Sequence, residues 1–138
     1  MRSEGRMVVA ALVRVDDGLS IDAEDSVEAI LRTGESMHLG LHFRYVDASA
    51  QRESLLLRLA STVGATSPPP VERRFRDRPI LKDTEFGTID QTFSFAEPGT
   101  FEGTFRAEAE YERADWLRAK TRGVQRHLVE VPVRVKVR

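Results

Sequence analysis

The chain has 138 residues, no cysteine and a formal net charge of −1, with 41% hydrophobic and 31% charged residues. This is the composition of a globular domain with a hydrophobic core, and it excludes a disordered chain, a disulfide-stabilised fold and thiolate metal sites. The near-neutral charge excludes a global electrostatic attraction to nucleic acids or membranes.

The N-terminal segment combines two arginines with a short apolar run over residues 7–13. The run is short for a secretory signal, Arg14 ends it, and no small-x-small cleavage motif follows. No stretch approaches the roughly 20 apolar residues of a membrane helix. We therefore predict a flexible tail over residues 1–6, a single β domain over residues 7–138, and a soluble protein that is cytoplasmic by default.

Residues 7–15 are apolar on both faces of a predicted strand, and an Asp-Asp-Gly turn follows them. Such a run is typical of a strand that is covered on both sides. The cover is either the rest of the domain or a partner chain, so this strand suggests self-association or docking on a larger complex.

Residues 22–34 fit two structures. Val27, Ile30 and Leu31 have helical spacing, whereas Val27, Ala29 and Leu31 alternate as in a strand. Because the rest of the chain has β patterns, we favour the strand.

Period-two alternation of apolar and polar residues predicts five further strands. In the last of them, Pro132 lacks a backbone N–H, which indicates a sheet edge or a bulge at that position. The five predicted strands cover residues 36–46, 53–62, 87–96, 100–112 and 127–138.

Residues 61–86 are the least regular part of the chain. Three consecutive prolines at 68–70 predict an extended linker, and residues 71–76 predict one more short strand. The complete pattern predicts an all-β fold, an antiparallel two-sheet sandwich of seven or eight strands. Within it, we expect residues 87–96 and 100–112 to form a hairpin through the Pro98-Gly99 turn.

The stretch "PGTFEGTF" and the alternating residues after it resemble the start of the sixth strand in immunoglobulin-like and fibronectin-III-like sandwiches. Phe101 stands where those folds place a corner tyrosine, and Gly103 where immunoglobulins place their second cysteine. "LRTGESMHLGLHFRY" is similar to the start of the second strand in bacterial immunoglobulin-like modules, which include carbohydrate-binding tail domains of polysaccharide ABC exporters. The resemblance implies an immunoglobulin-like sandwich. It departs from the family in lacking both cysteines and the tyrosine hydroxyl.

Charge patterning predicts how the last two strands pair. Glutamates on the outer face of residues 100–112 should lie opposite basic residues of the C-terminal strand, because like charges directly opposite are unfavourable. We expect Glu108 opposite Lys136 and Glu110 opposite Arg134, rather than the alternative that places Glu110 opposite Glu130.

The sequence contains little that points to catalysis. His38 and His42 are too far apart along one strand, about 13 Å, to bind one metal ion together, so a metal site would also need His127 or Asp47. No nucleophile elbow, glycine-rich phosphate loop or calcium loop is present. We predict no enzyme activity, no cofactor and no metal, with a small metal-dependent hydrolase as the remote alternative.

Two basic stretches are the candidate binding sites. Residues 113–138 hold eight Lys/Arg and two Asp/Glu, which leaves about −7 on the rest of the chain. We predict a non-catalytic interaction module that binds a protein partner or an anionic macromolecule through the loop between the last two strands; a carbohydrate-binding accessory domain is the alternative. The predicted contact residues are Trp116, Arg118, Lys120, Arg122 and Arg126, together with Arg73, Arg74, Phe75 and Arg76.

Overall fold

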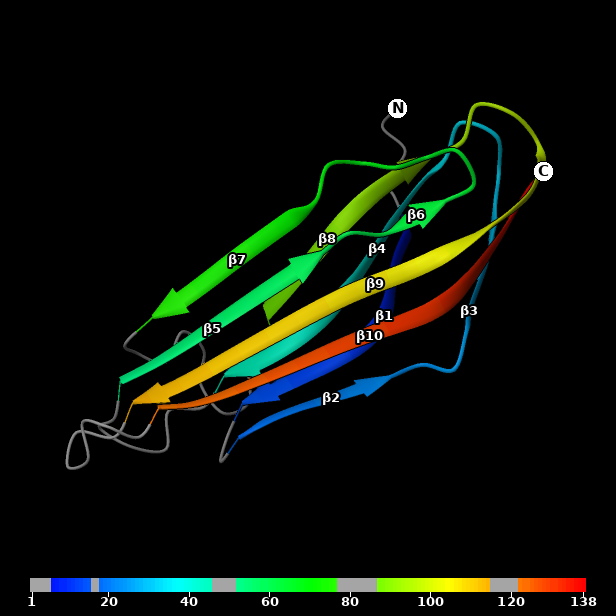
Figure 1. Cartoon of the computed structure of the whole chain (residues 1–138). Helices are drawn as coiled ribbons and strands as arrows, with labels where there is room; N and C mark the ends of the chain where they lie inside the picture. Colours follow the sequence, from blue (N-terminus) through cyan, green and yellow to red (C-terminus); the bar gives the residue numbers. More distant parts are fainter. Residues whose placement is uncertain (1–5, 16–17, 46–51, 77–86, 115–121) are drawn as a thin grey trace.

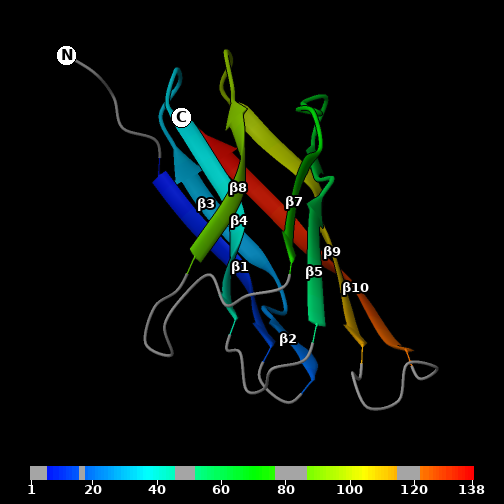
Figure 2. The same cartoon turned by 90° about the vertical axis from the view of Figure 1, so that its left-hand side faces the viewer.

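The computed structural model describes residues 6–15, 18–45, 52–76, 87–114 and 122–138. These residues form an all-β protein with two mixed sheets that pack against each other (Figures 1 and 2). The described strands are β1 (Arg6–Val15), β2 (Leu19–Ala23), β3 (Val27–Leu31), β4 (Ser36–Tyr45), β5 (Arg52–Leu59), β6 (Thr62–Val63), β7 (Val71–Arg76), β8 (Gly87–Ser94), β9 (Gly99–Ala114) and β10 (Arg122–Val137).

The first sheet has the strand order β2-β1-β4-β8 and the second has the order β3-β10-β9-β5-β7, with β6 also paired to β9. The pairs β1–β4 and β3–β10 are parallel, so the expectation of purely antiparallel sheets is wrong. Alternation along a strand predicts which side chains are buried, but it contains no information on the direction of the neighbouring strand. The ten described strands exceed the expected number because β2 is additional and β6 continues β5.

One core lies between the sheets, and alternate residues of the strands point into it. In β4, for example, Leu39 and Leu41 are fully buried, and in β9 Phe105 is fully buried opposite them in the other sheet. Each such side chain contributes about 1.5–3 kcal/mol when it is buried. The predicted inward faces are therefore confirmed for the alternating residues of β4, β5, β8, β9 and the second half of β10.

Residues 22–34 form strands, as expected, and not a helix. In β3, Val27, Ala29 and Leu31 are buried, whereas the residues between them are exposed. β2 belongs to the first sheet and β3 to the second, so the chain crosses between the sheets over residues 24–26.

The N-terminal strand is an internal strand of its sheet, between β2 and β4. Its pairing with β4 shifts between Val9 and Ala11, which is a β-bulge. The bulge allows two consecutive residues, Ala10 and Ala11, to be buried. The apolar character on both faces therefore results partly from this bulge, while Met7 stays 40% exposed.

The expected hairpin between residues 87–96 and 100–112 is wrong. β8 pairs with β4 in the first sheet, whereas β9 pairs with β5 and β10 in the second. The turn carries the chain from one sheet to the other, and the rings of Phe95 and Phe101 stack there with centroids 4.9 Å apart. A Pro-Gly turn is compatible with either arrangement. The contact between the buried Phe95 and the half-buried Phe101 favours the crossing.

The expected register of the last two strands is also wrong, although the charge principle behind it holds. The ladder places Glu110 opposite Arg126, Arg106 opposite Glu130, and Glu102 opposite Arg134. Opposite charges therefore face each other, but neither of the two registers considered from the sequence occurs. The error arose from the length of the connection, because β9 extends to Ala114 and β10 begins at Arg122.

Gly103 is required by the close approach of β6 to β9. It pairs with Val63, and a Cβ atom at this position would collide with the carbonyl oxygen of Thr62. A cysteine would therefore not fit at this position.

Gln91 is a buried polar residue that joins the two sheets. Its side chain is 2% exposed on β8. Oε1 accepts a hydrogen bond of 2.8 Å from the Ser61 N–H, and Nε2 donates one of 3.0 Å to the Pro69 carbonyl. The Ser61 hydroxyl in turn accepts a hydrogen bond of 3.0 Å from the Arg106 N–H, where β5 ends and β6 begins. A polar side chain at an inward position is thus fully bonded to the backbone of the opposite layer.

We expect Gln91→Leu to lower the free energy of unfolding by about 1–3 kcal/mol, because the Ser61 N–H would stay buried without an acceptor. Chemical denaturation monitored by circular dichroism measures this change. The control is Thr88→Ala on the exposed face of the same strand, which we expect to change stability by less than about 0.5 kcal/mol. Equal stabilities of the Gln91→Leu variant and the wild type would contradict the role of the amide.

Candidate functional site

The structure describes only part of the predicted binding loop. Trp116, Arg118 and Lys120 lie outside the described residues. Arg122 is the first residue of β10, and its backbone pairs with Ala114; its side chain is outside the described set. The described part of this candidate site therefore begins at the N-terminal half of β10.

The second basic stretch lies on β7, at the opposite edge of the second sheet. Arg73 and Arg74 are exposed, whereas Phe75 is 8% exposed and its ring packs against Phe43 at a centroid distance of 5.0 Å. Phe75 is thus a core residue, and the side chain of Arg76 is outside the described set. The described parts of the two stretches are separated in the sheet, because β9 and β5 lie between β10 and β7.

The histidines do not assemble a metal centre among the described residues. His38 Nδ1 lies 3.0 Å from Asp90 Oδ2 and 3.0 Å from Thr92 Oγ1 on the outer face of the first sheet. His127 belongs to the other sheet, and Asp47 is outside the described residues. Within the part of the chain that the structure describes, no group of three or more His, Cys, Asp or Glu residues could hold a metal ion.

Among the described residues, the N-terminal half of β10 is a free sheet edge, that is, an edge without a paired strand. β3 pairs with β10 only from Val133 to Val137, so residues 124–132 have β9 on one side and no paired strand on the other among the described residues. Gln125 makes a side-chain contact beside this edge, where its Oε1 accepts a hydrogen bond of 2.7 Å from the Leu19 N–H.

Hydrogen bonds at the ends of the ladder determine which backbone groups point to the free edge. The Arg138 N–H donates to Leu31 O, and Arg138 O accepts from the Thr33 N–H, so Arg138 faces the β3 side. On β9, Arg106 O accepts from the Ala60 N–H, so even-numbered residues of β9 face β5 and its odd-numbered residues face β10. Both observations agree that odd-numbered residues of β10 bond to β9.

The even-numbered residues of β10 therefore direct their N–H and C=O groups away from β9. The register runs without a shift from Val137 to Arg122, so this orientation holds along the whole strand. Pro132 is the last residue before β3 begins, and its missing N–H would point to the free side, where it breaks no bond of the ladder. The edge position that the sequence indicated for Pro132 is confirmed. The residues with outward-directed backbone groups on the free edge are Val124, Arg126, Leu128 and Glu130, with Pro132 contributing only its carbonyl.

The side chains along this edge are unusually uncovered for a strand of a packed sheet. All residues from 124 to 128 are exposed, and Val124 and Leu128 are 52% and 50% exposed. Two apolar side chains thus lie on the outer face next to outward-directed backbone groups.

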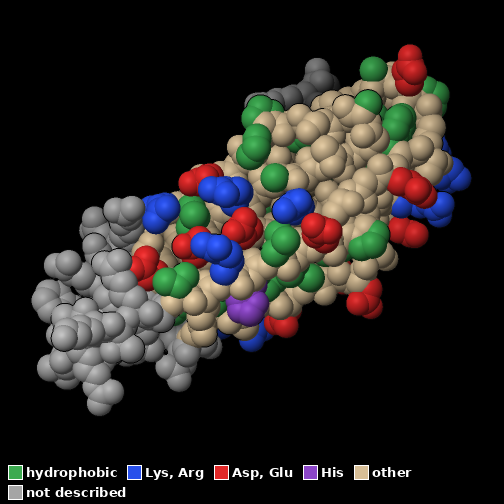
Figure 3. All heavy atoms as spheres, viewed as in Figure 1, with side chains coloured by type: hydrophobic (Ala, Val, Ile, Leu, Met, Phe, Trp, Pro, Cys, Tyr) green, Lys and Arg blue, Asp and Glu red, His purple; other side chains and the backbone are tan. Residues whose placement is uncertain are grey.

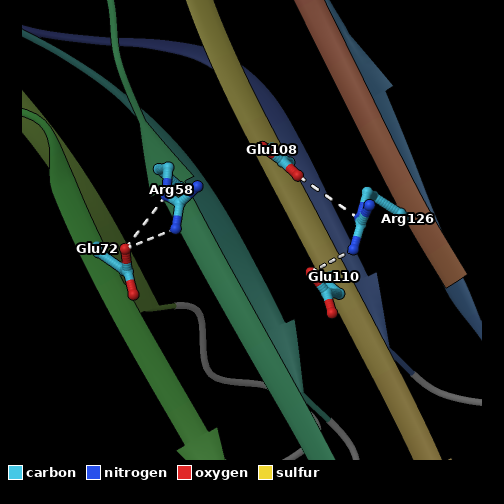
Figure 4. A network of polar contacts seen from close by, with 5 residues as sticks. All are labelled: Arg58, Glu72, Glu108, Glu110 and Arg126. Carbon is cyan, nitrogen blue, oxygen red and sulfur yellow. Dashed lines mark hydrogen bonds and ion pairs between the residues drawn. The ribbon is translucent and has the colours of Figure 1, made fainter. Parts of the chain in front are cut away.

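A row of alternating charges crosses the outer face of the second sheet and ends at this edge. Arg58 on β5 contacts Glu72 on β7 at 2.9 Å, and this hydrogen bond raises the pKa of the Arg58 guanidinium. On the other side, Arg126 lies 3.7 Å from Glu108 and 3.2 Å from Glu110 (Figure 4). Figure 3 shows acidic and basic side chains interspersed over this face.

The free edge ends at a shallow depression of about 280 Å³. It is lined by the first residues of β3, including Val27, and by Glu102, Pro132 and Arg134. Glu102 and Arg134 form an ion pair of 3.2 Å beside it. The depression therefore lies where β3 becomes the edge strand of the sheet.

Comparisons of the chain with family models, with curated proteins and with solved structures find no match. Among the described residues, no helix has the length and apolar character needed to cross a membrane.

The sequence reasoning placed Arg126 in the candidate site but did not identify the free edge. Pro132 was one feature of the sequence that indicated this edge. A second was the sequence before Val129, where polar residues interrupt the valine alternation on the inward face. Both features are consistent with a strand half that lacks a neighbour, but the extent of β3 was needed to recognise it.

Paired proline substitutions test the orientation of the edge. We expect Leu128→Pro to cost less than about 1 kcal/mol of stability, because it removes only an outward-directed N–H. His127→Pro should cost about 2 kcal/mol or more, because it removes an N–H that faces β9. Both side chains are exposed, so little packing changes. Thermal and denaturant unfolding measure the difference, and a greater loss for Leu128→Pro would contradict the assignment.

Proposed function

We propose that this protein is a non-catalytic interaction module with an immunoglobulin-like fold, and that it binds a protein partner by adding a strand of the partner to the free edge of β10. The observation that carries the proposal is the unpaired edge over residues 124–132 with its exposed side chains. Strand addition uses main-chain hydrogen bonds for affinity and alternate side chains for specificity.

The strand order of the second sheet supports the immunoglobulin-like assignment. In variable-type immunoglobulin domains, one sheet carries the strands G, F, C and C′ in this spatial order. Here β10, β9, β5 and β7 lie in the same spatial order. Along the chain they occur in the order β5, β7, β9 and β10, which corresponds to C, C′, F and G. The crossing between sheets directly before Phe101 also agrees with a start of the F strand. The departures are β1, which lies between β2 and β4, and the parallel pairing of β1 with β4.

The charges favour a protein partner over an anionic macromolecule. The basic excess of the C-terminal segment is compensated across the ladder, because Arg126 and Arg134 both contact glutamates of β9. The acidic residue of this strand half, Glu130, is itself paired, at 3.8 Å from Arg106 of β9. The described part of β10 thus presents paired charges and apolar side chains, which is the composition of a protein interface more than that of a polyanion site.

The carbohydrate-binding alternative receives no support from the described residues. Sugar binding on a sheet face would use exposed aromatic side chains, whereas the aromatic side chains that the structure describes are buried or half-buried. The hydrolase alternative lacks the cluster of histidines and carboxylates that it would need in this part of the chain.

Trp116, Arg118 and Lys120 belong to the segment that joins the end of β9 to the start of β10 in the sequence. We propose that this loop supplies the second set of partner contacts.

Partner capture with two variants at one position tests the proposal. Leu128→Pro and Leu128→Ala both remove the leucine side chain, but only the proline removes the edge N–H. We expect immobilised wild-type protein to retain a specific protein from an extract of the source cells, Leu128→Ala to retain it more weakly, and Leu128→Pro to lose it by at least about tenfold.

Circular dichroism on both variants checks that the fold is intact. A partner that binds all three proteins equally, or the absence of any specific partner, contradicts the proposal.

A further inference from the structure

We infer that the free edge of β10 pairs with the same edge of a second copy of this chain, antiparallel and about a two-fold axis at Leu128. This inference rests on the proposed use of the β10 edge and names its occupant. It follows from three properties of the edge: its limits, the direction of its backbone groups and its charges.

The limits of the edge allow this axis. β3 occupies the side of β10 from Val133 onward, so an added strand can pair no further than Pro132. Two copies paired about Leu128 use residues 124–132 of both chains, and Arg122 and Gly123 lie beyond the ends of the new ladder. The choice among the registers that fit within these limits therefore depends on the backbone groups and the charges.

The backbone orientation restricts the possible registers. Only even-numbered residues direct N–H and C=O groups outward, so an even residue of one copy must lie opposite an even residue of the other. An axis at Leu128 meets this condition. Leu128 then exchanges two hydrogen bonds with Leu128 of the partner subunit, and Arg126 exchanges two with Glu130 of the partner subunit. Pro132 falls at the end of the ladder, where its missing N–H removes one hydrogen bond from the terminal pairing at each end.

The side chains select this register among those that the backbone allows. Arg126 lies opposite Glu130 of the partner subunit on the outer face, twice by symmetry, and the leucines lie opposite each other. An axis at Arg126 or at Glu130 would place like charges directly opposite, which is unfavourable. Axes at His127 or at Val129 would place Leu128 opposite a charged residue. Only the axis at Leu128 combines opposite charges and apolar contacts without placing like charges directly opposite each other.

The charge row on the outer face continues across this interface. Within one chain it ends with Glu110 and Arg126 (Figure 4), and Glu130 lies beside Arg106. In the pair, Arg126 would be followed by Glu130 of the partner subunit and then by Arg106 of the partner subunit. Positively and negatively charged side chains would thus alternate across the interface without interruption. The pairing also covers an edge that would otherwise expose unpaired backbone groups for non-specific aggregation.

Charge exchange between two positions tests the register. Sedimentation equilibrium of the wild type should show a monomer–dimer equilibrium that depends on concentration. Arg126→Glu would place two glutamates opposite each other, and Glu130→Arg would place two arginines opposite each other. We expect each variant alone to dimerise at least about tenfold more weakly. A mixture of the two variants should form heterodimers. The introduced glutamate then faces the introduced arginine in one pairing, and the native Glu130 faces the native Arg126 in the other.

The matched control is Arg134→Glu, which makes the same charge change on the same exposed face of β10 where β3 already covers the edge. We expect it to leave dimerisation unchanged. Circular dichroism and thermal unfolding confirm that all variants are folded, since Arg126, Glu130 and Arg134 also take part in ion pairs within the chain. A single variant that dimerises as well as the wild type overturns the inference, as does a mixture that stays monomeric.

Amide hydrogen exchange gives a residue-level readout. Raising the protein concentration should protect the N–H groups of Arg126, Leu128 and Glu130, whereas those of His127 and Val129 should be protected at all concentrations. A wild type that remains monomeric at roughly millimolar concentration overturns the self-pairing. If the wild type is monomeric but the Leu128→Pro variant loses a partner other than this chain, the proposed strand addition stands without self-pairing.

Discussion

The register of the β9–β10 ladder is the constraint on which the second sheet depends. It runs unbroken from the pair Ala114–Arg122 to the pair Gly99–Val137. Because no bulge interrupts it, the hydrogen bonds at Arg138 determine how the backbone is oriented at Leu128, well along the strand. The same register sets the glutamates of β9 against the arginines of β10. Where the short β3 does not reach, the first half of β10 has no paired strand on its second side among the described residues.

The two sheets are held together by apolar packing and by one polar connection. Phe95 and Phe101 stack where the chain crosses between the layers, and Gln91 binds the backbone at Ser61 and Pro69 from the opposite layer. A buried amide is tolerated in this core only because its donors and acceptor are satisfied. The interaction also holds the break between β5 and β6 in place, and β6 in turn requires a glycine at position 103 of β9.

The exposed ion pairs contribute to specificity more than to stability. Pairs on a solvated surface typically contribute less than about 1 kcal/mol each, and Arg126 is 62% exposed. Their arrangement, however, discriminates between registers, both within the sheet and at its edge. The rule that opposite charges face each other across the ladder holds, but it led to the wrong register. The charge pattern does not determine how long the loop between the strands is, and the loop length sets the register. The candidate site was foreseen only in part: Arg126 lies at the edge, Phe75 belongs to the core, and the edge itself was not anticipated.

Period-two alternation alone was sufficient to predict the all-β class, the positions of most strands and their buried faces, because a side chain's face depends only on its parity along a strand. Around Val27 the local pattern fitted both a helix and a strand, and the β patterns in the rest of the chain correctly favoured the strand. Strand direction, the crossing at Pro98-Gly99, the register of β9 with β10 and the identity of the edge strands were not accessible in this way. They depend on which strands become neighbours, and that is set by packing between segments far apart in the chain. The free edge of β10 exists because β3, about a hundred residues earlier in the sequence, begins its pairing only at Val133.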